Sequence, residues 1–195
     1  MKKQGFSYEI AIDLPAAIKA ELARICCGLQ GIQWQDEQNF HLILRSLGVL
    51  EDNQALDIAE SLNQINLPPF ELSINGISHT LAGRGNGILW ASVRENADLI
   101  KLKKLIDKSL VDLQVPKEKK EAHGPIILGK FERLNENQLI DFLTSNSLFA
   151  SKSFLIEAFS LFSSHITEKR VFYVEEGTFK LKNKGFRPTN EFKSS

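Results

Sequence analysis

The fold is decided by the stretch Asn39-Phe40-His41-Leu42-Ile43-Leu44-Arg45-Ser46-Leu47-Gly48. Large apolar residues stand at every second position from Phe40 to Leu44, which is the pattern of a strand that buries one face. Successive side chains of a strand point to opposite faces. The face predicted to pack on helices carries Phe40, Leu42 and Leu44, and the opposite face is predicted to carry His41, Ile43 and Arg45.

A second stretch, Pro125-Ile126-Ile127-Leu128-Gly129-Lys130, repeats this pattern 84 positions after His41. Around each stretch the hydrophobic periodicity predicts the order strand, helix, motif strand, helix, strand. We therefore predict a single domain over 1–195, with lobes of roughly 1–82 and 83–195 and with strand exchange between the lobes left open. The predicted strands are 6–12, 39–47, 70–78, 87–94, 125–131, 153–162 and 170–182. One predicted helix follows Pro15, and the others cover 56–65, 97–113 and 136–146.

The composition is that of an ordinary soluble globular protein. Of the 195 residues, 43% are hydrophobic and 25% are charged, and 24 basic residues balance 24 acidic ones. A net charge of zero excludes a dedicated nucleic-acid binder with a broad positive field. No signal-peptide or membrane-spanning pattern is present, so no membrane association is expected.

The only cysteines are the neighbours Cys26 and Cys27. Adjacent cysteines on a helix point in different directions, so a bridge between them is not expected. This predicts a reducing compartment, and we expect a cytoplasmic location. No further ligands stand at zinc-binding spacing, so neither a metal nor another cofactor is predicted.

The first stretch resembles the "N-L-H-x-T-L-x-F-L-G" strand of the 2H phosphoesterases, in the branch of RNA 2',3'-cyclic phosphodiesterases and 2',5'-RNA ligases. The second stands where that family has "P-H-x-T-L-G-R". The family's other strands are resembled by Tyr8–Pro15, Ile88–Val93 and Phe159–Ser164. The resemblance implies an α+β fold of two pseudo-symmetric lobes, each an antiparallel sheet with two helices, around a central cleft.

The resemblance also implies a reaction that needs two histidines and two threonines. One imidazole acts as general base and the other as general acid, and the hydroxyls hold the phosphate. Here His41 is the histidine that matches. Ile43 and Ile127 replace the two threonines, and Pro125 replaces the second histidine. We therefore expect a catalytic position for His41 in a protein with weak or lost catalysis.

Four other side chains are candidates for a site. His123 lies two residues before Pro125 and is predicted on the same face, so it is a candidate substitute acid, with His79 a second one. Arg45 and Lys130 are candidates for binding phosphate. Strand alternation predicts that Lys130 points away from the face of Pro125.

Three functions compete on this evidence. The first is a 2H-phosphoesterase-like protein that binds a nucleotide or an RNA end with little turnover. The second is an active cyclic phosphodiesterase or RNA ligase that uses His41 and a substitute acid. The third is a protein-interaction module that uses the former active-site cleft for a protein partner. A monomer is expected in each case.

Overall fold

The computed structural model describes residues 6–82, 86–113, 115, 125–167 and 171–182. The strands pair antiparallel and are combined with α-helices, so the predicted α+β class is confirmed. The helices are α1 (Ala16–Ile25), α2 (Asp52–Leu62), α3 (Ala97–Leu110) and α4 (Glu136–Ser145), with a short 3-10 helix, η1 (Glu37–Asn39). The strands are β1 (Phe6–Asp13), β2 (Ile32–Trp34), β3 (His41–Leu50), β4 (Phe70–Leu72), β5 (Ile74–Ala82), β6 (Asn86–Val93), β7 (Ile126–Phe131), β8 (Phe154–Ile156), β9 (Ala158–Ile166) and β10 (Val171–Lys180).

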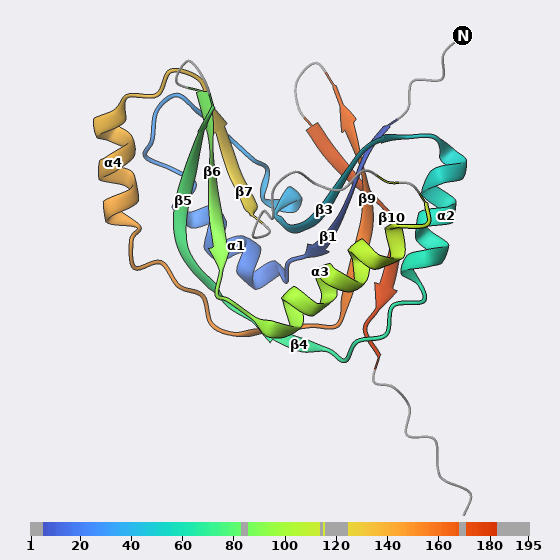
Figure 1. Ribbon diagram of the computed structural model, residues 1–195. Helices are drawn as coiled ribbons and strands as arrows, with labels where there is room; N and C mark the ends of the chain where they lie inside the picture. Colours follow the sequence, from blue (N-terminus) through green and yellow to red (C-terminus); the bar gives the residue numbers. More distant parts are fainter. Residues whose placement is uncertain (1–5, 83–85, 114, 116–124, 168–170, 183–195) are drawn as a thin grey trace, which may run out of the picture.

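Most of the strands form one sheet with the order β10-β9-β1-β3-β7-β6-β5, and β2 pairs with β7 beside β3. Figure 1 shows that this sheet divides into two halves that splay apart. We call β1, β3, β9 and β10, with α2 and α3, the first lobe. The second lobe contains β2, β5, β6 and β7, with α1 and α4. The two-lobe fold is therefore confirmed. The first lobe takes strands from both ends of the chain, and the strands of the second lobe come from the middle of the chain.

Contacts between helices follow the same division. In the first lobe, the Ser61 hydroxyl on α2 donates to the Ser109 carbonyl on α3 at 2.8 Å. In the second lobe, a pocket is lined by the end of α1 and by α4, including Arg24 and Phe142. The ring of Trp34 on β2 also lies 5.8 Å from that of Phe142, centroid to centroid. Helices thus cover one face of the sheet in each lobe and leave the other face for the motif residues.

The helices form where the sequence supplies both a cap and an apolar stripe. The Asn96 side chain accepts a hydrogen bond from the backbone of Leu99 at 2.9 Å and so caps the start of α3. The buried stripe of α3 repeats at helical spacing. It consists of Leu99, Leu102, Ile106 and Leu110. The helix ends at Leu110, earlier than the periodicity alone predicts.

Two predicted strands each prove to be two, and the one expected over 153–162 divides at Glu157 into β8 and β9. The segment expected as a strand over 70–78 divides at Ser73 into β4 and β5. β4 pairs with β8 in a small separate sheet, whereas β5 joins β6 in the large one. The chain changes sheets at this point, and periodicity does not register such a change. β2 and η1 were not predicted, because both are only 3 residues long.

A local two-fold relation joins the two lobes. β3 and β7 meet where Leu42 pairs with Ile126, and β4 and β8 are centred on the pair Glu71 and Leu155. Each pair joins residues 84 positions apart, which is the spacing of the two motif stretches. Equivalent positions of the motifs therefore lie on either side of one axis.

No helix within the described ranges is long and apolar enough to cross a membrane.

Candidate functional site

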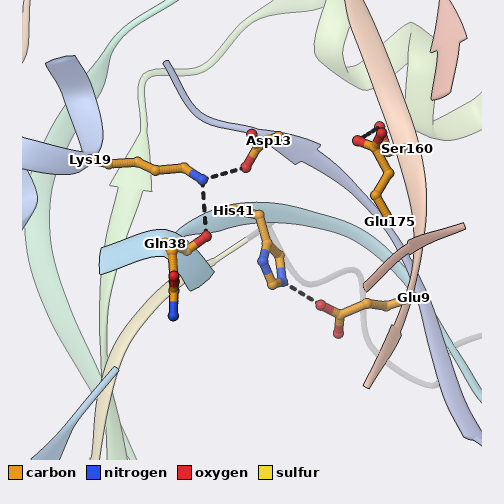
Figure 2. A network of polar contacts seen from close by, with 7 residues as sticks. All are labelled: Glu9, Asp13, Lys19, Gln38, His41, Ser160 and Glu175. Atoms are coloured by element: carbon orange, nitrogen blue, oxygen red, sulfur yellow. Dashed lines mark hydrogen bonds and ion pairs between the residues drawn. The ribbon is translucent and has the colours of Figure 1, made fainter. Parts of the chain in front are cut away.

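His41 begins β3 and is almost fully buried, with 6% of its surface exposed. Its Nε2 atom contacts the Oε1 atom of Glu9 on β1 (Figure 2). The imidazole stacks on Phe162 of β9, with ring centroids 5.4 Å apart, and meets the ring of Tyr173 of β10 edge-on at 4.6 Å. The side chain expected to be catalytic is thus enclosed by a carboxylate and two aromatic rings of the first lobe.

Tyr173 is the second titratable group in this enclosure. Burial and, to a lesser degree, the negative charge of Glu9 raise the pKa of its phenol to about 12, against the opposing effect of a hydrogen bond with Gln35. A phenol with this pKa stays protonated at neutral pH and is a poor proton donor there. Tyr173 therefore contributes an aromatic wall and a hydroxyl, and does not replace a catalytic imidazole.

The three substituted motif positions share one face with His41. Leu42 and Ile126, which pair across β3 and β7, are both fully buried on the helix-covered side. Their neighbours in sequence therefore point to the other side, which we call the motif face. Ile43, Pro125 and Ile127 are half-buried there. The strands touch directly, because the Ile43 amide donates to the Pro125 carbonyl at 3.4 Å.

Each motif strand contains a β-bulge at the same motif position. In β3 the extra residue is Leu44, because the residues on either side of it pair with consecutive residues of β1. In β7 the extra residue is Leu128, for the same reason against β6. Both leucines are buried in the core. A bulge reverses the alternation of every residue that follows it, so two expectations about the motif face change.

The expectation that Arg45 shares the face of His41 is wrong. After the bulge at Leu44, Arg45 pairs with the buried Ile10 and points to the helix-covered side. Its Nε atom lies 3.7 Å from an Asp107 carboxylate oxygen of α3. Arg45 therefore packs between sheet and helix, away from the motif face.

The expectation that Lys130 points away from the face of Pro125 is also wrong. The bulge at Leu128 places Lys130 opposite Ile88, two residues along β6 from the partner of Ile127. Lys130 is exposed on the motif face. It is a cation of the second lobe that a ligand on this face can reach.

A second cation lies at the other end of the face. Lys19 on α1 binds Asp13 at 2.6 Å and the Gln38 carbonyl at 3.0 Å (Figure 2). Asp13 is the cross-strand neighbour of His41. A pocket of about 530 Å³ adjoins this point, and its lining includes Lys19 and Gln38.

Comparison with known proteins identifies chains that are similar to this one. Residues 12–90 match the model of the LigT-like phosphoesterase family, a range that includes His41 and ends before the second motif. An RNA 2',3'-cyclic phosphodiesterase of Archaeoglobus fulgidus is 23% identical over 174 residues, which cover 87% of this chain and 97% of that protein.

Solved structures show the same fold. The crystal structure of Escherichia coli LigT complexed with 3'-AMP matches with a TM-score of 0.74 at 19% identity, over 91% of this chain and 99% of that one. A protein of Thermus thermophilus matches with a TM-score of 0.71 at 16% identity, over 92% and 100%. LigT has also been crystallised with NADP+, ATP and phosphate.

The resemblance to the 2H phosphoesterases is confirmed.

The second motif of this 2H phosphoesterase-like chain lacks the histidine that the family has there. His123, the candidate substitute for the missing histidine, lies outside the described residues. His79 on β5 pairs with Leu89, so the register places it on the opposite face from Ile127. His165 packs between Phe6 and Phe172 at the far end of the first lobe. Neither His79 nor His165 is therefore positioned to replace the second imidazole.

Sequence reasoning missed Glu9, Tyr173 and Lys19, which complete the 2H phosphoesterase-like motif face. A signal for Glu9 was present, since it is a charged residue in the middle of a strand that alternates with Tyr8 and Ile10. Its partner was not readable, because the contact with His41 depends on the pairing of β1 with β3. Tyr173 reaches His41 from a strand more than 130 positions away in sequence.

Proposed function

We propose that this protein binds a nucleotide or an RNA end on the motif face and turns over cyclic phosphates slowly or not at all. One observation carries the proposal: among the described residues, the motif face presents the imidazole of His41 and presents hydrocarbon at Ile43, Pro125 and Ile127. General acid–base catalysis by one side chain contributes roughly 10²–10⁴ in rate. A donor to a developing charge contributes roughly 10²–10³ more.

Binding of a nucleotide depends less than catalysis does on the missing imidazole and the two missing hydroxyls. Lys130 adds an exposed positive charge to the face, while Tyr173 and Phe162 offer aromatic surface beside His41. Stacking on an aromatic side chain stabilises a bound base by roughly 1–3 kcal/mol. The complexes of E. coli LigT with 3'-AMP and ATP support a nucleotide as the ligand of a protein with this fold.

An active cyclic phosphodiesterase is the second candidate. The contact between Glu9 and His41 favours it, because a carboxylate that holds an imidazole in one orientation is a recurring part of general-base sites. The acid that would complete this reaction is not among the histidines of the described residues.

The test compares a short RNA that ends in a 2',3'-cyclic phosphate with the same RNA ending in hydroxyls. We expect the cyclic end to bind about tenfold more tightly, the scale of a hydrogen bond to a charged group. His41→Gln is expected to remove this preference. His165→Gln is the matched control, because it makes the same change in the same lobe away from the motif face.

The same mixtures are then assayed for ring opening. We expect a rate far below the enzyme median of about 10 s⁻¹. A rate near that median, abolished by His41→Gln, contradicts the proposal and supports the active enzyme. Equal binding of both RNAs contradicts the proposal that the motif face recognises the phosphate end, and it favours a protein-interaction module on that face.

The cytoplasmic location, the monomeric state and the division of the chain into sequence halves at 82 and 83 stay predictions beside this proposal.

A further inference from the structure

The contact between Glu9 and His41 puts a negative charge where a phosphate ligand would bind. The Glu9 side chain is 13% exposed and that of His41 6%. Water and salt screen such shielded charges less than they screen charges on an open surface. Any anion that approaches the Nε2 atom of His41 therefore meets the carboxylate of Glu9 at close range.

Two other carboxylates of the first lobe are already engaged elsewhere. Asp13 is paired with Lys19 at 2.6 Å. Glu175 accepts hydrogen bonds from the Ser160 hydroxyl at 3.0 Å and from the Thr178 hydroxyl at 2.6 Å. Glu9 is the carboxylate that contacts the imidazole, so its charge acts on the ligand position most directly (Figure 2).

We infer that Glu9 determines the specificity of this site. Its carboxylate lies at the Nε2 atom of His41 on the motif face, and it selects for singly charged phosphodiesters over doubly charged phosphomonoesters. The inference rests on the proposed function, since it concerns which phosphate the motif face accepts.

The physical reason is the charge difference between the two kinds of phosphate. A phosphomonoester carries a charge of about −1.5 to −2 at neutral pH. A cyclic phosphodiester has no second ionisable oxygen and carries a single negative charge. The additional charge interacts unfavourably with Glu9 across a few ångströms in a partly shielded site. We expect this repulsion to change the ratio of affinities by about tenfold.

The experiment measures equilibrium binding of adenosine 2',3'-cyclic monophosphate and of 3'-AMP by calorimetry, at neutral pH and fixed salt. The wild-type protein is expected to bind the cyclic nucleotide about tenfold more tightly. In Glu9→Gln, which removes the charge and keeps the shape, this ratio is expected to fall to within about twofold of unity.

Glu175→Gln is the matched control. It removes one negative charge from the same lobe without touching His41, so the affinity ratio is expected to stay at the wild-type value. Loss of the ratio in both variants overturns the inference, because a general change in charge then explains the result. Melting curves check that each variant is folded.

The wild-type measurement stands even if a variant fails to fold. Tighter binding of 3'-AMP than of the cyclic nucleotide by the wild-type protein overturns the inference. So does a ratio that survives in folded Glu9→Gln, and in both cases nucleotide binding itself is upheld. Absence of binding of either nucleotide to wild-type and variant protein overturns the proposed function together with this inference.

Discussion

The two motif strands, β3 and β7, have similar backbones and different chemistry. Each contains a bulge at its leucine, Leu44 or Leu128, and each buries that leucine in the core. On the motif face, an imidazole at the start of β3 corresponds to a proline just before β7. The comparison shows that packing against helices preserves the strand and its bulge, whereas side chains on the motif face change without disturbing either.

The residue that follows each bulge points to the helix-covered side, and the space available to its side chain differs between the two lobes. Arg45 follows the first bulge and reaches Asp107 on α3. Gly129 follows the second, where β2 runs alongside, and an added Cβ would come within 2.8 Å of Ile32. The second lobe therefore has no room for a side chain at the position where the first lobe accommodates an arginine.

The largest expected effect comes from making the two strands chemically alike. The triple change Ile43→Thr, Pro125→His and Ile127→Thr restores two hydroxyls and the second imidazole on the motif face. Threonine keeps the β-branching that suits a strand. The regained acid alone contributes roughly 10²–10⁴ in rate, so we expect ring opening of a cyclic-phosphate dinucleotide to accelerate by at least about 10³-fold over the parent, with the two donors adding to this. Initial rates at saturating substrate measure this.

The control for the triple variant adds His41→Ala, which should remove most of the gain in rate. A folded triple variant with no gain in rate would show that β3 and β7 differ in more than these side chains. A marked fall in melting temperature would show that the motif face is packed dry in the folded protein.

Truncating the two bulge leucines tests whether their burial stabilises the two motif strands by similar free energies. Leu44→Ala and Leu128→Ala each remove a buried side chain, and we expect each to lower the free energy of unfolding by about 3 kcal/mol. Ile127→Ala, on the half-buried motif face next to the second bulge, is the matched control and should cost about 1 kcal/mol. Urea denaturation measures all three. Equal costs for Ile127 and Leu128 would mean that the two faces of β7 are packed alike.

The smallest expected effect concerns the two cations that follow the bulges, Lys130 on the motif face and Arg45 on the helix-covered side. Lys130→Gln removes an exposed charge from the motif face and is expected to weaken nucleotide binding by roughly threefold, the scale of an exposed ion pair. Arg45→Met keeps an unbranched stem on the helix-covered side and should leave the affinity within about twofold. Titration at low salt gives the clearest difference. The reverse ranking would place Arg45 at the ligand.

The order of strands and helices could be predicted because it depends on local periodicity, and the α+β class with two lobes followed from the resemblance to the 2H phosphoesterases. The alternation before the bulge in β3 predicted the face of His41 and Ile43 correctly. Past the bulge it failed for Arg45, and past the second bulge it failed for Lys130. A bulge is fixed by pairing with a neighbouring strand, and a single strand's pattern does not contain that information.

The candidate site was predicted only in part for a related reason. His41 was recognised from its own motif, whereas Glu9 and Tyr173 reach it through the pairing of β1 with β3 and through the hairpin of β9 and β10. Long-range contacts of this kind depend on the order of strands in the sheet.

The exchange of strands between the lobes also affects the protein while it is being synthesised. The strand β3, which pairs with β1, is synthesised soon after it, but the other neighbour of β1, β9, begins only at Ala158. At a typical elongation rate of about 5–20 residues per second, the free edge of β1 waits roughly 5–20 s for its partner. An unpaired strand edge is a template for association with other chains, and a charged side chain within the strand opposes this. Glu9, in the middle of β1, supplies that charge to the nascent chain before it ever meets a nucleotide.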